Sequence, residues 1–360
     1  MKHLLHITTA ITLLASMNVS ATNKTIDTDY YGKTIFIEAD TKEVISMGTG
    51  WRGNNRRNGT IEQATPRALG IDNAVSVIAS VGRQFILQAD GSVWMVDRRS
   101  DYNDIKVRPP VQLPISNVSD VEANTHNAYF IVDGSVFQMD IASQGKAELV
   151  KGLPNNIVEI SVAIFHSVAR SANGDIYIWR GKRNSQSDIP QIISDLPAIK
   201  AISTARYNTV LTDVDGQVWA MDEGRKGSRT DFNTWSPLKL PINNPQAVVK
   251  GYAGMLQTMV LFNDDHVETI KWHNHKRGSD FNMSYKLSAA PALTGIKDMD
   301  SGMHSMFIKQ DGKVIGLGSN DKGQLGNGLY SETHVAGGIL PIIWPESYTE
   351  TFTLTKLNLK

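Results

Sequence analysis

Short runs of apolar residues alternate with polar turns along nearly the whole chain. Three of these runs are residues 85–87 (FIL), 129–131 (YFI) and 306–308 (MFI). β-Branched and aromatic residues in runs of this length favour strands. No segment combines a helical repeat of apolar positions with capping residues. The pattern therefore predicts an all-β chain that reads strand, turn, strand throughout.

A turn signal recurs between these runs. It is an acidic or amide residue, usually followed by Gly, then a polar residue and a β-branched aliphatic one. The copies begin at Asp90, Asp133, Asn173, Asp215, Asp264 and Asp311, with a weaker copy at Thr41. Asp-Gly and Asn-Gly between apolar runs are strong hairpin signals, because both central residues of the favoured turn have positive φ. Successive copies lie 40 to 50 residues apart, which indicates an internal repeat.

A small residue stands ten positions before each of the six strong copies. These residues are Ser80, Ala123, Ala163, Ala205, Gly254 and Ser301. Such a recurrence predicts crowded strand ends near a shared axis, where a larger side chain would collide with the neighbouring repeat. Proline, which cannot donate into a strand ladder, marks the ends of the repeats. We expect seven units, at about 33–70, 71–114, 115–154, 155–197, 198–241, 242–294 and 295–345.

The two ends of the chain lie outside these units. Residues 22–32 form a short N-terminal segment, and residues 346–360 include the alternating stretch Thr351 to Thr355. Alternation of polar and apolar residues predicts a half-buried strand. We expect this strand to join residues 34–37 of the first unit and so close the ring. The alternative is a solvated tail.

Residues 1–21 have the character of a secretory signal peptide. Lys2 is followed by an apolar stretch through Leu14, and the small residues Val19 and Ala21 suit a cleavage site. The alternative, a membrane anchor, is disfavoured because the apolar run is shorter than the ~20 residues of a span. The chain has no cysteine, which excludes a lipid-modified cysteine, disulfides and thiolate chemistry. We expect a bacterial protein exported to the periplasm or the medium, with no stable membrane insertion after cleavage.

The last repeat carries most of a known motif. It contains Gly302-Met303-His304-Ser305, then Asp311-Gly312, and a glycine-rich end with Gly318, Gly323, Gln324 and Gly326. With the repeats in register, the sequence resembles the regulator of chromosome condensation family over about residues 33–345. The resemblance implies a seven-bladed β-propeller. The middle five units lack the glycine-rich end, which implies irregular outer loops at residues 98–108 and 223–233.

The resemblance also implies roles for the histidines and glycines. His126, His166 and His304 occupy the family's repeating histidine position, which implies structural residues that hydrogen-bond the blade backbone. Gly318, Gly323, Gln324 and Gly326 are likewise expected to be structural. His273 and His275 would share one face of a strand as half of a metal site, but no third ligand is evident. We expect neither a metal nor a cofactor.

Charge and motifs narrow the function. With 36 basic and 36 acidic residues, the chain gives no reason to expect a nucleic-acid partner. Nuclear members of the family are exchange factors for a small GTPase and dock on nucleosomes, and a signal peptide contradicts that location. Secreted bacterial proteins similar to the family include inhibitors that clamp β-lactamases. The resemblance thus implies a binding platform for another macromolecule, most plausibly a protein.

Two alternatives to this binding platform stay open. One is a periplasmic or secreted hydrolase or lyase assembled from distant loops, although no nucleophile elbow, phosphate loop or zinc-helix motif is present. The other is an intracellular exchange factor, should the chain not be exported. The sequence does not fix the oligomeric state.

The expected contact lies at one mouth of the propeller channel. The two residues before each repeating histidine position should form loops that ring this mouth. Large residues among them are Phe165, Arg206, Tyr207, Met255, Leu256 and Met303. Side chains of this kind are common interface anchors when exposed. Packing between adjacent loops is the equal alternative.

Overall fold

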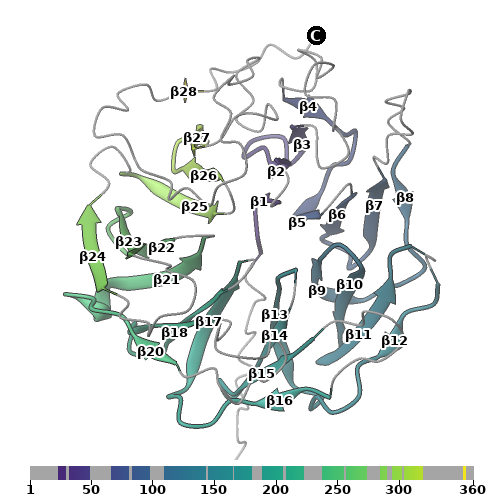
Figure 1. The fold of residues 1–360 in the computed structure, drawn as a ribbon. Helices are drawn as coiled ribbons and strands as arrows, with labels where there is room; N and C mark the ends of the chain where they lie inside the picture. The colour runs from purple at the N-terminus through teal and green to yellow at the C-terminus, as the bar shows by residue number, and fades with distance from the viewer. Residues whose placement is uncertain are drawn as a thin grey trace, which may run out of the picture.

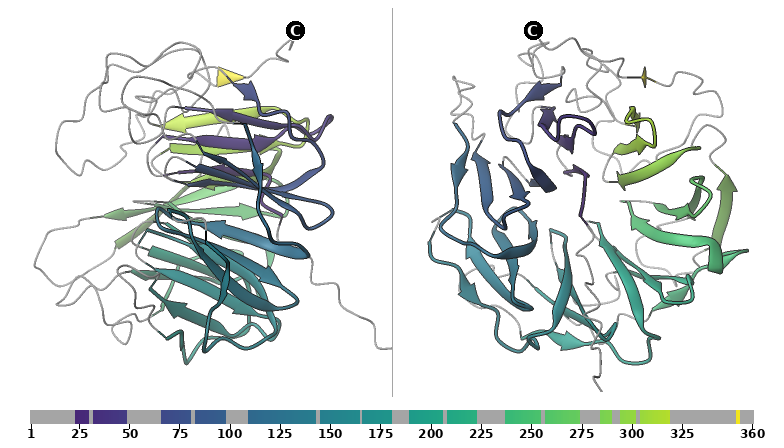
Figure 2. Two further views of the ribbon diagram at one scale, coloured as in Figure 1. Left: turned by 90° about the vertical axis from the view of Figure 1, so that its right-hand side faces the viewer. Right: turned by 180° about the vertical axis from the view of Figure 1, so that it is seen from behind.

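Seven four-stranded antiparallel sheets surround a central axis (Figure 1). The computed structural model describes residues 23–29, 32–48, 66–80, 83–97, 109–142, 145–164, 166–180, 189–205, 208–222, 237–254, 257–273, 284–289, 294–301, 304–318 and 352–353. Each sheet consists of four strands consecutive in the sequence, and Figure 2 shows the ring from the side and from behind. The predicted seven-bladed β-propeller is confirmed.

The strands take the same four places in every blade. The innermost strands are β1 (Ile26–Thr28), β5 (Ala74–Ser80), β9 (Val118–Ala123), β13 (Ile157–Val162), β17 (Ile199–Thr204), β21 (Val248–Ala253) and β25 (Ile296–Ser301). The second strands are β2 (Thr34–Ile37), β6 (Arg83–Gln88), β10 (Asn127–Val132), β14 (Ser167–Ser171), β18 (Asn208–Asp213), β22 (Gln257–Phe262) and β26 (His304–Lys309). The third strands are β3 (Val44–Met47), β7 (Val93–Asp97), β11 (Ser135–Asp140), β15 (Ile176–Trp179), β19 (Val218–Asp222), β23 (Val267–His273) and β27 (Val314–Gly318).

The outermost strands are short. They are β4 (Arg67–Ala68), β8 (Val111–Gln112), β12 (Glu148–Leu149), β16 (Gln191–Ile192), β20 (Leu238–Lys239), β24 (Ser284–Ala289) and β28 (Phe352–Thr353). A 3₁₀ helix, η3 (Pro245–Ala247), precedes β21. Within the described ranges, no helix has the length and apolar character needed to cross a membrane.

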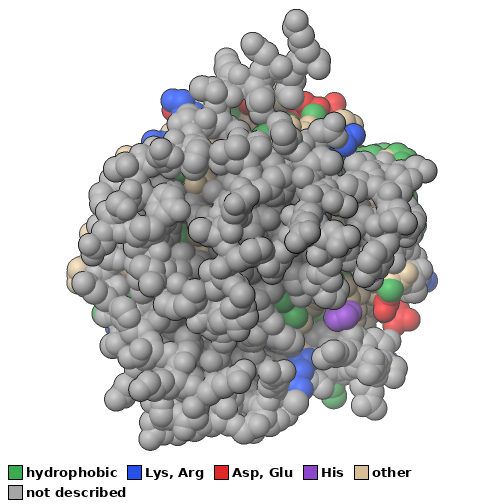
Figure 3. Space-filling model, turned by 45° about the horizontal axis from the view of Figure 1, so that its top comes forward, with side chains coloured by type: hydrophobic (Ala, Val, Ile, Leu, Met, Phe, Trp, Pro, Cys, Tyr) green, Lys and Arg blue, Asp and Glu red, His purple; other side chains and the backbone are tan. Residues whose placement is uncertain are grey.

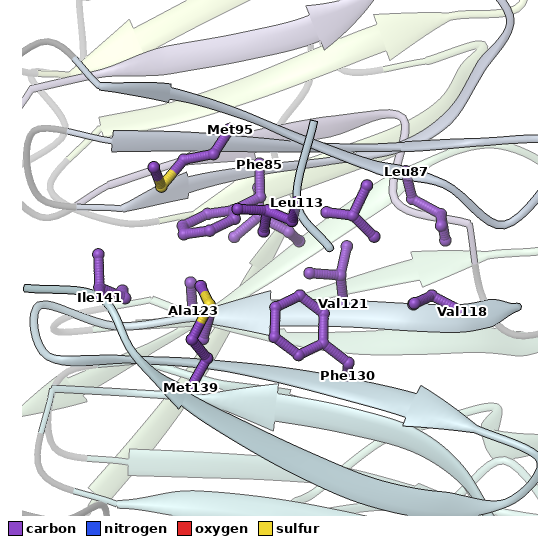
Figure 4. Packing of buried hydrophobic residues seen from close by; sticks show 13 residues of the cluster. Phe85, Leu87, Met95, Leu113, Val118, Val121, Ala123, Phe130, Met139 and Ile141 are labelled. Atoms are coloured by element: carbon purple, nitrogen blue, oxygen red, sulfur yellow. The ribbon is translucent and has the colours of Figure 1, made fainter. Parts of the chain in front are cut away.

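The apolar core lies between the blades. The described residues form seven buried clusters, and each joins two neighbouring sheets. Between the second and third blades, Phe85 and Leu87 of β6 face Val121 and Phe130 of β9 and β10 (Figure 4). Because each sheet buries both of its faces, its strands have apolar residues on both sides. The ring is therefore held by interfaces of blade against blade.

The recurring turn signal is also a contact between blades. The carbonyl of Gly134 accepts a hydrogen bond from the peptide N–H of Ile157, the first residue of the next innermost strand. The carbonyl of Gly174 does the same for Ile199. A Cβ atom at Gly216 would lie 1.8 Å from the carbonyl oxygen of Pro245. At Gly134, Gly174 and Gly216, a positive-φ turn without a side chain therefore fits against the backbone of the following blade.

The two chain ends differ from the prediction. Strand β28 pairs with β27, Ile315 opposite Thr353, so the expected pairing of the tail with residues 34–37 is wrong. Strand β2 already has β1 and β3 on its two sides. Residues 22–32 are therefore more than a preceding segment, because they supply β1, whose Ile26 is fully buried between the last and first blades. The first blade begins before residue 33 and the last ends after residue 345.

Candidate functional site: the channel cavity

A cavity of about 460 Å³ lies in the central channel. Residues of all seven innermost strands, β1, β5, β9, β13, β17, β21 and β25, line it. The predicted small residues Ser80, Ala123, Ala163, Ala205 and Ser301 also line it. These five mark the crowded ends of the innermost strands, as the repeat pattern predicts. The cavity also extends to Asn124, Thr125 and Ile164, which follow those strand ends in the sequence.

A β-bulge at one place in six innermost strands sets which side chains face this cavity. The register shifts near the start of β5, β9, β13, β17, β21 and β25. A bulge leaves one residue unpaired and re-aims the side chains that follow. The first paired residues after it are Ser76, Asp120, Glu159, Ala201, Lys250 and Asp298. All of these except Ser76 line the cavity.

One lysine ties three blades together at the cavity wall. Lys24 Nζ donates to Glu122 Oε1 at 2.6 Å and to Asp27 Oδ1 at 3.1 Å. Burial disfavours the charged form of Lys24, but attraction by Asp27, Glu122 and Asp300 outweighs burial and holds its pKa well above the usual value. Lys24 is therefore a fixed positive charge in the channel. Its peptide N–H also donates to Ser76 Oγ of the second blade at 3.3 Å.

Asp120 is a buried carboxyl of the cavity wall with a raised pKa. Burial, together with repulsion from Glu122, raises the pKa of its carboxyl to about 8. Its two oxygens accept hydrogen bonds from the peptide N–H groups of Val121 at 2.9 Å and Ile160 at 3.0 Å. The second of these bonds crosses from the third blade to the fourth. Asp120 thus holds a junction and carries a titratable group in the same cavity.

Two aspartates join the last blade to the first. Asp298 Oδ2 accepts hydrogen bonds from the peptide N–H of Thr25 at 3.0 Å and from its hydroxyl. Asp300 Oδ2 accepts from the peptide N–H of Thr28 at 2.9 Å and from its hydroxyl at 2.6 Å. Tyr252 Oη of the sixth blade donates to Asp298 Oδ1 at 3.4 Å. Side-chain hydrogen bonds of this kind therefore join the last blade to the first, whose described strands form two separate sheets.

The variant Asp120→Asn should lose a pH dependence of stability that the wild type has. Lys24, Glu122 and Glu159 are the charged groups that act on this carboxyl. Because its folded pKa lies above its unfolded pKa, the unfolded state loses the proton first, and the Asp120 contribution falls as the pH rises from about 4 to about 8. We expect urea denaturation to show the wild type losing stability relative to Asp120→Asn across this range, by about 1.4 kcal/mol per unit of the shift. Parallel profiles for the two proteins would contradict this assignment.

The predicted partner-binding residues cannot be compared with this geometry. Phe165, Arg206, Tyr207, Met255, Leu256 and Met303 lie outside the described residues, as do Gly323, Gln324, Gly326, His275 and both predicted loops. Their described predecessors in the sequence include Ile164, Ala205 and Ser301, which line the cavity. His273 closes β23 and Gly318 closes β27. The described residues contain no group of three or more His, Asp or Glu side chains that could hold a metal ion.

The structure describes the side chains of two of the three predicted repeat histidines, His126 and His166. His166 is buried, and its Nε2 lies 2.8 Å from Thr209 Oγ1, a side chain of the next blade. Burial lowers the pKa of His166 to about 3 and keeps it neutral. His126 is exposed; its peptide N–H donates to Asn124 Oδ1, and its carbonyl accepts a hydrogen bond from the peptide N–H of Ile141. Only the backbone of His304, in β26, is described.

The charged residues of the cavity were not among the site residues predicted from the sequence. They had a detectable signal, because the segments VSDVEA and IKDMDS alternate charged and apolar residues just before the small residue of their repeats. In the structure Val121 and Met299, between the acids, pack into the clusters between blades. On the face shown in Figure 3, by contrast, the described charged side chains stand in small separate groups of both signs.

The fold is that of a known group of propellers. Prp20p of Saccharomyces cerevisiae superimposes with a TM-score of 0.61 at 12% identity, over 82% of this chain and 85% of that chain. A solved structure of yeast RCC1 (Prp20) bound to Kap60 gives a TM-score of 0.58 at 14% identity, over 82% of each chain. The fold of this chain is an RCC1-like seven-bladed propeller. Human WBSCR16 is similar to this RCC1-like chain at a TM-score of 0.58 and 14% identity, over 75% of this chain and 83% of that chain.

Sequence comparison finds a further similar protein. The E3 ubiquitin-protein ligase HERC2 of Mus musculus is 25% identical over 333 residues, which cover 78% of this chain. The chain spans only 7% of the length of that relative. No family model matches the sequence. These relations support the RCC1-like fold, and they leave the activity to be argued from the site.

Proposed function

We propose that this chain is an exported RCC1-like propeller that binds a protein at the mouth of its channel and has no catalytic activity of its own. The observation that carries the proposal is the cavity, which reaches the ends of the innermost strands at Asn124, Thr125 and Ile164. A rigid ring with a hollow at its axis can take a side chain or loop of a partner. The solved Prp20p structure is described together with its binding to Gsp1p and histones, which is a precedent for protein binding on this fold.

Capture from the envelope and medium of the producing cells tests the proposal. The bait is the chain without residues 1–21, and the comparison is the variant Arg206→Ala/Tyr207→Ala. We expect one protein in stoichiometric amount with the wild type and at least tenfold less with the variant. Lys239→Ala, at an exposed position of outer strand β20, is the control and should capture as the wild type does. Equal capture by all three baits would place the contact elsewhere, and the absence of any specific protein would overturn the proposal.

A second candidate function is catalysis in the cavity, as a hydrolase or lyase. The observation that favours it is Asp120, because a carboxyl with a pKa near 8 suits a general acid or base at neutral pH. Both of its oxygens, however, accept backbone hydrogen bonds. Turnover of sugar or peptide substrates that Asp120→Asn abolishes without unfolding the chain would favour the enzyme over the platform.

A further inference from the structure

The first blade enters the ring through a short segment, residues 23–29, that lines the channel cavity. Its strand β1 has three residues, whereas the other innermost strands have six or seven. Carboxylic side chains of other blades supply much of the remaining support. Asp298 and Asp300 of the last blade accept hydrogen bonds from this segment, and so does Glu122 of the third blade. The position of the segment therefore depends on acids that can gain or lose a proton.

Asp27 is the acid that the segment itself contributes to this arrangement. Its Oδ1 accepts a hydrogen bond from Lys24 Nζ at 3.1 Å, and its Oδ2 accepts one from the peptide N–H of Ala79 in the second blade. Burial raises the pKa of Asp27 well above its usual value, although attraction by Lys24 opposes this change. Repulsion from Asp300 and Glu122 adds to the increase. Asp27 therefore gives up its proton at a higher pH than an exposed aspartate does.

A single lysine stands between two of these acids. Lys24 Nζ lies 3.1 Å from Asp27 Oδ1 and 2.6 Å from Glu122 Oε1. Burial raises the pKa of Glu122 as well, and attraction by Lys24 opposes that change. With one of the two carboxyls ionised, the group of three has no net charge, whereas with both ionised it has an excess negative charge. Buried like charges repel, so the second ionisation weakens the contacts that hold the segment.

The other charged groups of the cavity wall do not bring a second cation to this group. Among the described residues, only Lys24 lies within ion-pair distance of Asp27 or Glu122. Lys250 also attracts Glu122, but its Nζ lies 3.5 Å from Glu159 Oε1. The titratable groups that line the wall around the two acids are Asp29 after β1, Asp120 of β9, Glu159 of β13, Lys200 of β17, Lys250 and Tyr252 of β21, and Lys297, Asp298 and Asp300 of β25. The balance of charge at Asp27 and Glu122 therefore rests on Lys24.

We propose that residues 23–29 are a proton-controlled latch of the ring, which holds while Asp27 or Glu122 keeps its proton and loosens when both are ionised. Both carboxyls have a raised pKa, so the unfolded chain loses these protons first. Their contribution to stability is therefore complete at a pH below about 4 and is lost as the pH rises through the folded values. Since the segment lines the cavity, its release changes the wall of the channel. The latch is a property of the ring itself, so it goes beyond the proposed function and does not need a partner.

Hydrogen–deuterium exchange of the chain without residues 1–21, at pH 6 and at pH 9, tests the latch, with each rate divided by the intrinsic rate of the peptide group at that pH. We expect the protection of peptides that contain residues 23–29 and 76–80 to fall at least tenfold at pH 9, while a peptide from β17 keeps its protection. Asp27→Asn, which cannot ionise, should keep the protection of the segment at pH 9. Asp72→Asn, at an exposed acid before β5, should behave as the wild type does. Unchanged protection in the wild type, or an equal fall in Asp27→Asn, would overturn the proposal.

A second variant, Glu122→Gln, keeps the test decisive if Asp27→Asn does not fold. It leaves one acid at Lys24, so the segment should keep its protection at pH 9, and a fall as large as in the wild type would contradict the latch. The capture experiment is separate, because it detects a partner rather than the exchange of this segment. A latch found without any captured protein would support this inference while the proposed function fails.

Discussion

The double variant Asp298→Ala/Asp300→Ala is expected to lower the free energy of unfolding by about 3 to 5 kcal/mol. Both carboxylates accept hydrogen bonds from the peptide N–H and hydroxyl groups of Thr25 and Thr28 across the junction of the last and first blades. Their removal leaves peptide donors in the channel wall without acceptors, which costs about 1–3 kcal/mol for each group. Urea denaturation followed by far-ultraviolet circular dichroism measures the loss.

The matched control for the ring junction is Asp72→Ala/Glu148→Ala. Both of these acids are exposed, so their loss should change the stability by less than about 0.5 kcal/mol each. If the channel variant does not fold, the single variant Asp300→Ala should show about half of the effect. Equal stability of the two double variants would mean that the apolar cluster around Ile26 closes the ring without the aspartates.

The variant Gly216→Ala is expected to cost about 3 kcal/mol or more. Gly216 has a φ of 81°, and a Cβ there would stand 1.8 Å from the carbonyl oxygen of Pro245 in the following blade. The left-handed backbone costs an alanine about 1–2 kcal/mol. The collision adds to this cost, because the obstacle is backbone and the two blades must move apart. The midpoint of thermal unfolding, measured by calorimetry, reports the sum.

Gly70→Ala separates the two terms of the Gly216 prediction. Gly70 has a similar φ of 68°, but a Cβ there would meet nothing within 4 Å. The variant Gly70→Ala should therefore lower the free energy of unfolding only by the cost of left-handed backbone, about 1–2 kcal/mol. A loss at Gly216 no larger than that at Gly70 would show that the turn does not press on the next blade.

The repeats were predictable because one local constraint recurs in every blade. The turn has positive φ in all seven blades: five have Gly at this place, as at Gly134 and Gly174, whereas the first and sixth have Lys42 and Asp265. The small residues at the ends of the innermost strands also recur in the sequence. Ala123 and Ala163, for example, both border the cavity near the axis. Their spacing predicted six units, the weaker copy at Thr41 added the seventh, and the resemblance to the regulator of chromosome condensation family implied the propeller.

The ends of the ring could not be predicted from the same signals. Strand β1 has only three residues, and no turn mark precedes it. Its place depends on hydrogen bonds to Asp298 and Asp300, about 270 residues away in the sequence, which no local pattern encodes. A strand in the tail was predicted, but the predicted pairing with residues 34–37 was wrong, because a two-residue strand such as β28 carries little information on which strand it pairs with.

The candidate site was only partly predictable. The alternation of acids with Val121 and Met299 was visible in the sequence, but the direction of these acids depends on the β-bulge before them. The pKa of Asp120 depends on burial and on Glu122 and Glu159, of which Glu159 belongs to another blade. Charges brought together from separate repeats become apparent only when the ring is closed.

Hydrogen–deuterium exchange of the chain with its captured protein tests the binding face most directly. If the partner sits on the channel mouth, peptides that contain Asn124–Thr125, Ala163–Ile164 and Thr204–Ala205 should exchange at least tenfold more slowly in the complex. Peptides from the outer strands β8, β12, β16 and β20 should be unchanged. Slowed exchange confined to those outer strands would contradict a platform that binds through its channel mouth.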